Sequence, residues 1–143
     1  AREGDTSAHR RERIGDVVVL GFSQGGGLSF HAADADRTHV KACIGIEPHG
    51  VPTQFRPAIP GTPALMVFGD FIEQDDYWRD MARRGREALD AWAQAGGRGE
   101  VCNLPELGIR GNTHMMMMDR NSDEIASLLV QRLDQWQNMD VFR

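Results

Sequence analysis

Ser23 lies at the centre of a Gly-x-Ser-x-Gly motif that runs from Gly21 to Gly25. An apolar run at residues 17–20 precedes the motif, and small residues follow it. This order predicts a strand, a tight turn that carries the serine, and a helix. The two glycines are expected to leave room for chain and substrate, and the amide of Gln24 can donate a hydrogen bond to an oxyanion. The motif therefore predicts that Ser23 is a nucleophile.

A histidine is needed as well, because a serine hydroxyl is a weak nucleophile at neutral pH and imidazole titrates in the right range to act as its base. His114 follows a glycine-rich loop at residues 105–113 and is the favoured candidate. His31 falls inside the helix after the serine and His39 opens a strand, so both are expected to be structural. His49 is the remaining alternative, and its early place in the chain disfavours it.

A carboxylate completes such a site by holding the imidazole in one tautomer and stabilising the imidazolium. Glu47 directly follows a predicted strand, and Asp70 and Glu73 follow the next one. Each choice puts the residues in the order serine, acid, histidine, which is one of several orders known among serine hydrolases. Sequence spacing leaves the choice between the three carboxylates open.

The composition of the chain disfavours several other classes. The 143 residues carry a formal net charge of −5, which argues against nucleic acid as the main partner. No apolar segment is long enough for a membrane span. The serine turn lacks both Gly-x-Gly-x-x-Gly and a following lysine, which argues against a nucleotide-binding loop. Cys43 and Cys102 fall in predicted strands and are expected to be buried free thiols.

The elements that must position these residues follow from apolar patterning. Strands are predicted at residues 16–20, 39–46, 64–68 and 100–104. Helices are predicted at residues 24–33 and 77–95 and from Asn121 onward, and residues 6–14 are expected to form the last turns of a helix. Asn121 and Glu124 have the spacing of a capping box. This alternation predicts an α/β fold with a mostly parallel sheet, flanking helices, and ligands at the C-terminal ends of the strands.

Four stretches together resemble a bacterial serine esterase family of the α/β-hydrolase superfamily. They are G-F-S-Q-G-G-G from Gly21, I-G-I-E-P-H-G from Ile44, A-L-M-V-F-G-D-F-I-E from Ala64, and G-N-T-H-M-M-M-M-D-R-N from Gly111. The resemblance covers about residues 17–136, and its histidine motif is far more specific than its serine motif.

The resemblance implies a small-molecule ester as substrate and a triad of Ser23, Glu47 and His114. It implies no cofactor and no metal. Asp70 and Glu73 match acidic positions of the family other than the triad acid.

Two further side chains are candidates for the substrate pocket. Phe22 stands where many members of the family have histidine, a difference expected to alter the pocket wall. Met115 begins a run of four methionines, which either line an adaptable pocket next to His114 or fill the space between loop and sheet.

The resemblance also implies that residues 1–143 form a partial domain, corresponding to strands five to eight of the hydrolase fold. The earlier strands and the loop that supplies the second oxyanion amide would then be missing, and the first strand would be an exposed sheet edge. A non-catalytic truncated or complementing half-domain is therefore one alternative. A second alternative keeps the triad but cleaves lactones or amides.

Overall fold

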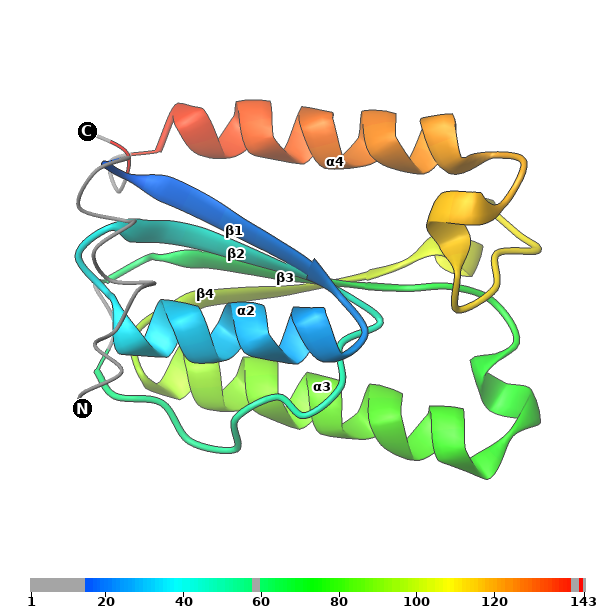
Figure 1. Ribbon diagram of the computed structural model, residues 1–143, viewed down its shortest axis with the longest axis horizontal. Coiled ribbons are helices and arrows are strands. Elements are labelled where there is room, and N and C mark those ends of the chain that lie inside the picture. The colour runs from blue at the N-terminus through cyan, green and yellow to red at the C-terminus, as the bar shows by residue number, and fades with distance from the viewer. Residues whose placement is uncertain (1–14, 58–59, 140–141, 143) are drawn as a thin grey trace, which may run out of the picture.

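The computed structural model describes residues 15–57, 60–139 and 142, so the helix expected at residues 6–14 lies outside the described residues (Figure 1). One sheet contains the strands β1 (Val17–Phe22), β2 (Val40–Ile46), β3 (Pro63–Phe68) and β4 (Arg98–Asn103). These strands are all parallel and lie side by side in chain order. The helices are α2 (Gln24–Ala35), α3 (Asp76–Gln94) and α4 (Ser122–Gln137). The predicted α/β class and parallel sheet are confirmed.

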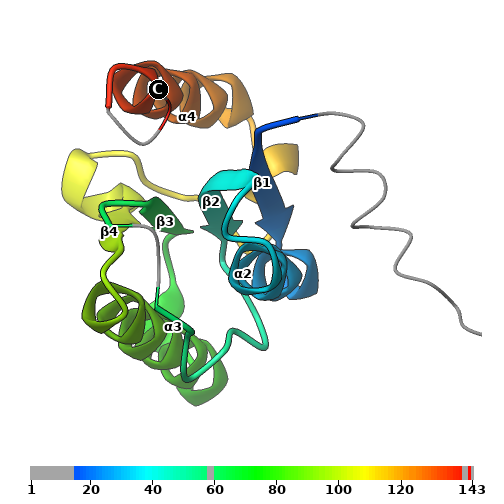
Figure 2. The ribbon, with the colours of Figure 1, turned by 90° about the vertical axis from the view of Figure 1, so that its left-hand side faces the viewer.

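Helices cover both faces of the sheet, with α2 and α3 on one face and α4 on the other (Figure 2). Alternate residues of each strand serve the two faces, as the pleat of a strand requires. In β3, for example, Met66 packs toward α2 and α3, whereas Leu65 and Val67 pack toward α4. Because both faces are covered, β2 and β3 are almost wholly apolar and buried.

The predicted element bounds agree with the structure to within about two residues, and the differences have simple causes. β1 continues beyond residue 20 because Gly21 and Phe22 still pair with β2, opposite Gly45 and Ile46. β4 begins at Arg98, two residues earlier than predicted. Its first residues are exposed and polar, so apolar patterning does not detect their pairing with β3.

The predicted capping box at α4 is wrong. The side chain of Asn121 makes no capping hydrogen bond; it pairs with the side chain of Asn112. Asn121 Nδ2 donates to Asn112 Oδ1 at 3.0 Å, and Asn112 Nδ2 donates to Asn121 Oδ1 at 2.6 Å. Asn112 is fully buried, and a buried amide without hydrogen-bond partners lowers the stability of the fold. The side chain of Asn121 therefore pairs with this amide and does not cap the helix.

Both cysteines are free and buried, as predicted. Burial raises the pKa of each thiol, so Cys43 and Cys102 stay protonated at neutral pH. In the described part of the chain, no helix has the length and apolar character needed to cross a bilayer.

β1 forms one edge of the sheet, as expected from the resemblance. Val17 and Val19 pack toward α2, while Val18 and Leu20 on the opposite face are exposed. Leu20 keeps 50% of its surface accessible.

The described residues also form three short 3₁₀ turns, at Ile72–Gln74, Leu104–Leu107 and Met116–Met118. The first precedes α3, and the last lies between His114 and α4. The second turn directly follows β4.

Candidate active site

Ser23 occupies the turn between β1 and α2, with backbone φ 53° and ψ −122°. A non-glycine residue in this region is strained, and such strain is concentrated at functional sites. The turn is held by hydrogen bonds on both sides. Ser23 N donates to Ile46 O at 2.9 Å, and Ser23 O accepts from His49 N at 2.8 Å and from Gly27 N at 3.2 Å. The serine turn is therefore fixed to the segment that follows β2.

Two glycines let the backbone approach itself closely around this turn. A Cβ on Gly21 would lie 2.1 Å from Gly25 O, and a Cβ on Gly27 would lie 1.7 Å from His49 O. A Cβ on Gly25 would meet no atom within 4 Å. Gly21 therefore permits the close approach of the chain that the motif predicts. The second glycine that permits such an approach is Gly27, outside the Gly-x-Ser-x-Gly motif, and not Gly25.

Glu47 follows the end of β2 and is 1% exposed. Because Phe22 of β1 pairs with Ile46 of β2, Ser23 and Glu47 follow neighbouring positions at the same edge of the sheet. Glu47 has a φ of 41° and donates its backbone N–H to Val67 O at 2.9 Å. The backbone that carries the buried carboxylate is therefore held in place.

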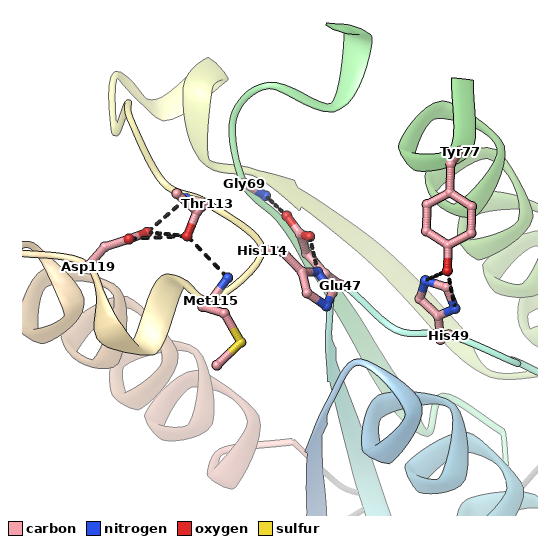
Figure 3. A network of polar contacts seen from close by, with 8 residues as sticks. All are labelled: Glu47, His49, Gly69, Tyr77, Thr113, His114, Met115 and Asp119. Carbon is pink, nitrogen blue, oxygen red and sulfur yellow. Dashed lines mark hydrogen bonds and ion pairs between the residues drawn. The ribbon is translucent and has the colours of Figure 1, made fainter. Parts of the chain in front are cut away.

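The Glu47 carboxylate bridges β3 and the histidine loop (Figure 3). Oε1 accepts a hydrogen bond from Gly69 N at 2.8 Å, and Oε2 lies 2.6 Å from His114 Nδ1. A carboxylate can only accept, so Nδ1 carries the proton and Nε2 of the neutral ring is left as an acceptor. This is the tautomer that a general base requires.

Aromatic rings surround the His114 imidazole. The ring of Phe22 lies 4.7 Å from it and the ring of Trp78 lies 4.5 Å from it, measured between centroids. Phe22 is the direct neighbour of Ser23 and so connects the serine turn to the imidazole. Across the described residues, no hydrogen bond joins the Ser23 hydroxyl to His114; contacts of this type often tighten only when substrate is bound.

The two alternative carboxylates lie in different surroundings. Asp70 Oδ2 accepts from Gly111 N at 3.1 Å and Oδ1 accepts from Phe71 N at 3.0 Å. These backbone hydrogen bonds hold the pKa of Asp70 below its usual value. Glu73 is exposed in the 3₁₀ turn. Of the three candidate acids, Glu47 alone has a carboxylate hydrogen-bonded to His114 in the described structure.

His49 lies beside this group of residues, with its ring centroid 6.4 Å from that of His114. Its Nε2 is 3.2 Å from the hydroxyl of Tyr77. Partial burial lowers the pKa of His49, the neighbouring His114 lowers it further, and Glu47 opposes both effects. His49 is therefore neutral at neutral pH.

The other two histidines in the described residues have structural contacts, as expected. His31 Nε2 lies 3.0 Å from Gly50 O and so ties α2 to the loop after Glu47. His39 Nδ1 lies 3.1 Å from the Asp36 carboxylate.

Polar side chains within the histidine motif hold the loop that carries His114 (Figure 3). Asp119 Oδ2 accepts from Thr113 N at 2.8 Å, and Asp119 Oδ1 accepts from the Thr113 hydroxyl at 3.2 Å. The same hydroxyl accepts from Met115 N at 3.2 Å, and Asn112 Nδ2 donates to Asp119 Oδ2 at 3.3 Å. Sequence reasoning did not identify these residues, although their polar character beside the histidine was a usable signal.

The four methionines differ in their burial. Met116 is buried in the core beneath α4. Met115, Met117 and Met118 are exposed, and Met115 keeps 43% of its surface accessible. The part of the chain that the structure describes has no group of three or more histidine, cysteine, aspartate or glutamate side chains that could hold a metal ion.

Comparison with known proteins relates this geometry to enzymes. No protein-family model matches the chain. A bacterial esterase of known structure matches 90% of the chain with a TM-score of 0.77 and 32% sequence identity. The chain resembles a bacterial esterase in both sequence and fold. It spans 41% of that esterase.

A curated relative, the probable secreted lipase phiG of a fungus (Fungal sp. strain ATCC 74256), is 26% identical to the chain over an alignment that is 182 residues long. That match covers 91% of the chain and 50% of the lipase. The esterase-like chain therefore spans about half the length, or less, of these two relatives.

The Asp119 carboxylate offers a direct test of how the histidine loop is held. Asp119→Ala removes the acceptor of Thr113 N and Asn112 Nδ2, and we expect it to lower the free energy of unfolding by roughly 1–3 kcal/mol. Asp134→Ala is the matched control, because Asp134 lies exposed on α4 and its side chain makes no hydrogen bond in the described structure. Urea unfolding followed by circular dichroism measures both changes. Equal stability of the two variants would contradict the assigned role of Asp119.

Proposed function

We propose that this chain carries the catalytic residues of a carboxylic-ester hydrolase that forms an acyl-enzyme on Ser23. The observation that carries the proposal is the 2.6 Å contact between Glu47 Oε2 and His114 Nδ1, at the sheet edge where the strained turn of Ser23 also lies. The resemblance to a bacterial esterase and to a probable secreted lipase supports an ester as the bond that is cleaved.

In the first half of the reaction, His114 Nε2 takes the proton of the Ser23 hydroxyl while Oγ attacks the carbonyl carbon of the ester. The imidazolium that forms is stabilised by the carboxylate of Glu47. The carbonyl oxygen becomes an oxyanion and accepts a hydrogen bond from Gln24 N–H. Gln24 is the first residue of α2, so its amide is free of intrahelical bonds and lies at the positive end of the helix dipole.

The tetrahedral intermediate then collapses. The bond between the carbonyl carbon and the alcohol oxygen breaks, and His114 Nε2 returns its proton to the departing alcohol. Water next attacks the acyl group on Ser23 with His114 again as base, and the carboxylic acid is released with Ser23 restored. No cofactor or metal is part of this scheme.

A covalent probe tests the nucleophile. In the full-length protein, a fluorophosphonate probe is expected to label the peptide that contains Ser23, and Ser23→Ala is expected to lose both the label and ester hydrolysis. Ser127→Ala, on the exposed face of α4, is the control and should label normally. Mass spectrometry of the labelled peptides gives the result. Labelling that persists in Ser23→Ala would overturn the assignment.

A second candidate is that the chain contributes a non-catalytic or complementing half of such a domain. The observation that favours it is the position of β1 at the sheet edge, with Leu20 half exposed. Ester hydrolysis by the isolated 143-residue chain, lost in Ser23→Ala, would contradict this candidate.

A further inference from the structure

Trp78 packs its indole against the imidazole of the proposed general base, His114. The two ring centroids lie 4.5 Å apart, and a tilt of 37° between the ring planes is closer to stacking than to an edge contact. Phe22 contacts the same imidazole from β1, with centroids 4.7 Å apart. The scheme for acyl transfer gives no role to Trp78, although its ring is in direct contact with the base.

Local contacts hold Trp78 near the start of α3. Asp75 caps this helix, because its Oδ1 accepts from Tyr77 N at 2.8 Å. The indole is half-buried and packs against the core cluster beneath α2 and α3. The rings of Tyr77 and His49 lie nearly perpendicular to it, with centroids 5.1 and 6.2 Å away. Trp78 is therefore positioned by α3 and the core, from a different part of the chain than the serine turn.

The charge of the His114 ring changes during the proposed reaction. At rest Nδ1 donates to Glu47 Oε2 and the ring is neutral; once Nε2 has taken the proton of Ser23, the ring is a cation. The face of an aromatic ring is negative and attracts a cation within about 6 Å of its centroid, and tryptophan does so most strongly. An attraction that grows as the proton moves lowers the barrier to that step.

The titratable groups around His114 do not compete with this attraction. Glu47 binds Nδ1, and Asp70 borders the same cavity as His114. Backbone hydrogen bonds hold the pKa of Asp70 below its usual value, so it is ionised. His49 is neutral because partial burial and the nearby His114 lower its pKa, and it faces the Tyr77 hydroxyl (Figure 3). The charges of these groups stay the same when only the tryptophan ring is altered.

We propose that Trp78 stabilises the imidazolium form of His114 through a cation–π contact, and so acts as a positioning residue for acyl transfer on Ser23. The inference rests on the proposed ester hydrolysis and adds a residue of α3 to it. Because the contact strengthens only as the imidazolium forms, Trp78 should affect kcat more than KM.

Fluorinated tryptophans placed at position 78 of the full-length protein test this role. Ring fluorines weaken the negative face stepwise, while the indole keeps nearly the same size and becomes more apolar. With one, two, three and four fluorines, kcat for an activated ester is expected to fall in steps, by roughly 3- to 30-fold in total. KM should stay nearly constant. A side chain that only fills space would not give this order.

An NMR titration of the His114 ring in Ser23→Ala measures the same contact without turnover. The protonation constant of the ring is expected to fall with each added fluorine, by roughly the same total factor. Trp136, buried beneath α4, is the control, and the same fluorinated residues there should change neither quantity. A kcat that does not fall with fluorination at Trp78, or that falls equally at Trp136, would overturn the proposal.

Trp78→Phe and Trp78→Leu give a second comparison. Phenylalanine keeps an aromatic face and leucine keeps only apolar volume, so kcat should be lower in Trp78→Leu. Equal values of kcat in these two variants would count against the cation–π contact.

The two readouts distinguish failure of this inference from failure of the proposed function. If the wild-type protein hydrolyses esters but neither kcat nor the protonation constant responds to fluorination, the role of Trp78 alone is wrong. If the wild-type protein neither hydrolyses esters nor labels with fluorophosphonate, the proposed function is wrong. The NMR titration then decides by itself whether Trp78 stabilises the His114 cation.

Discussion

Glu47→Gln is expected to reduce kcat for ester hydrolysis by a factor on the order of 10⁴, the loss found when a triad carboxylate becomes an amide. Asp70→Asn is expected to cause a much smaller loss. The two variants make the same chemical change at two carboxylates that contact the histidine loop, Glu47 at His114 Nδ1 and Asp70 at Gly111 N. The difference between them therefore reports which carboxylate orients the imidazole.

The hydrogen bonds of Glu47 explain why glutamine should fail at this position. Gly69 N–H needs an acceptor, so the amide oxygen of the new side chain would take the place of Oε1. The amide NH₂ would then face His114 Nδ1, which would have to accept instead of donate. The ring proton would move to Nε2, and the imidazole could no longer take the proton of Ser23.

Steady-state kinetics on an activated ester, with near-UV circular dichroism to verify folding, tests this expectation. Asp70 gives the matched comparison because its carboxylate accepts two backbone hydrogen bonds and none from His114 in the described structure. A larger loss in Asp70→Asn than in Glu47→Gln would move the role of the acid from Glu47 to Asp70.

Gly27→Ala is expected to destabilise the fold by about 3 kcal/mol or more, at the upper end of the cost of overpacking. The new methyl carbon would lie 1.7 Å from His49 O and 2.8 Å from His49 C. Both atoms belong to the backbone, so no side chain can move aside. The helix would have to separate from the loop that carries Glu47.

Gly25→Ala, two residues earlier in the same helix, is the control. Its methyl group would meet no atom within 4 Å. Because alanine is the better helix former, we expect stability to be kept or raised by up to about 1 kcal/mol. Urea denaturation of both variants, followed by circular dichroism, measures the difference. Equal stability of the two variants would show that α2 and the Glu47 loop are not packed as described.

Local patterns in the sequence were sufficient for most of the fold. Buried parallel strands are short apolar runs, and α3 shows a helical apolar stripe, so periodicity located these elements to within about two residues. The start of β4 was missed because its pairing with β3 involves only backbone groups there and does not depend on apolar side chains.

The sequence by itself also determined the candidates for chemistry, because Ser23 and His114 occur in motifs with recognisable local character. Spacing along the chain left three carboxylates open, and the resemblance to the esterase family favoured Glu47. Only the tertiary structure placed Glu47 Oε2 at 2.6 Å from His114, across 67 positions of chain. That contact depends on strands whose ends meet at one sheet edge, which spacing along the chain does not encode.

The contacts that support the site were decided by the tertiary structure alone. Asn121 has the sequence position of a helix cap, but its side chain binds the buried amide of Asn112 instead. The reason is that an unpaired buried amide costs more free energy than an uncapped helix end. Gly27 is the last of three successive glycines near the start of α2, but the close contact that it permits comes from a distant segment that folds against it. Local patterns determine which residues can react and which segments form strands or helices, whereas burial and long-range backbone contacts determine which of those residues meet.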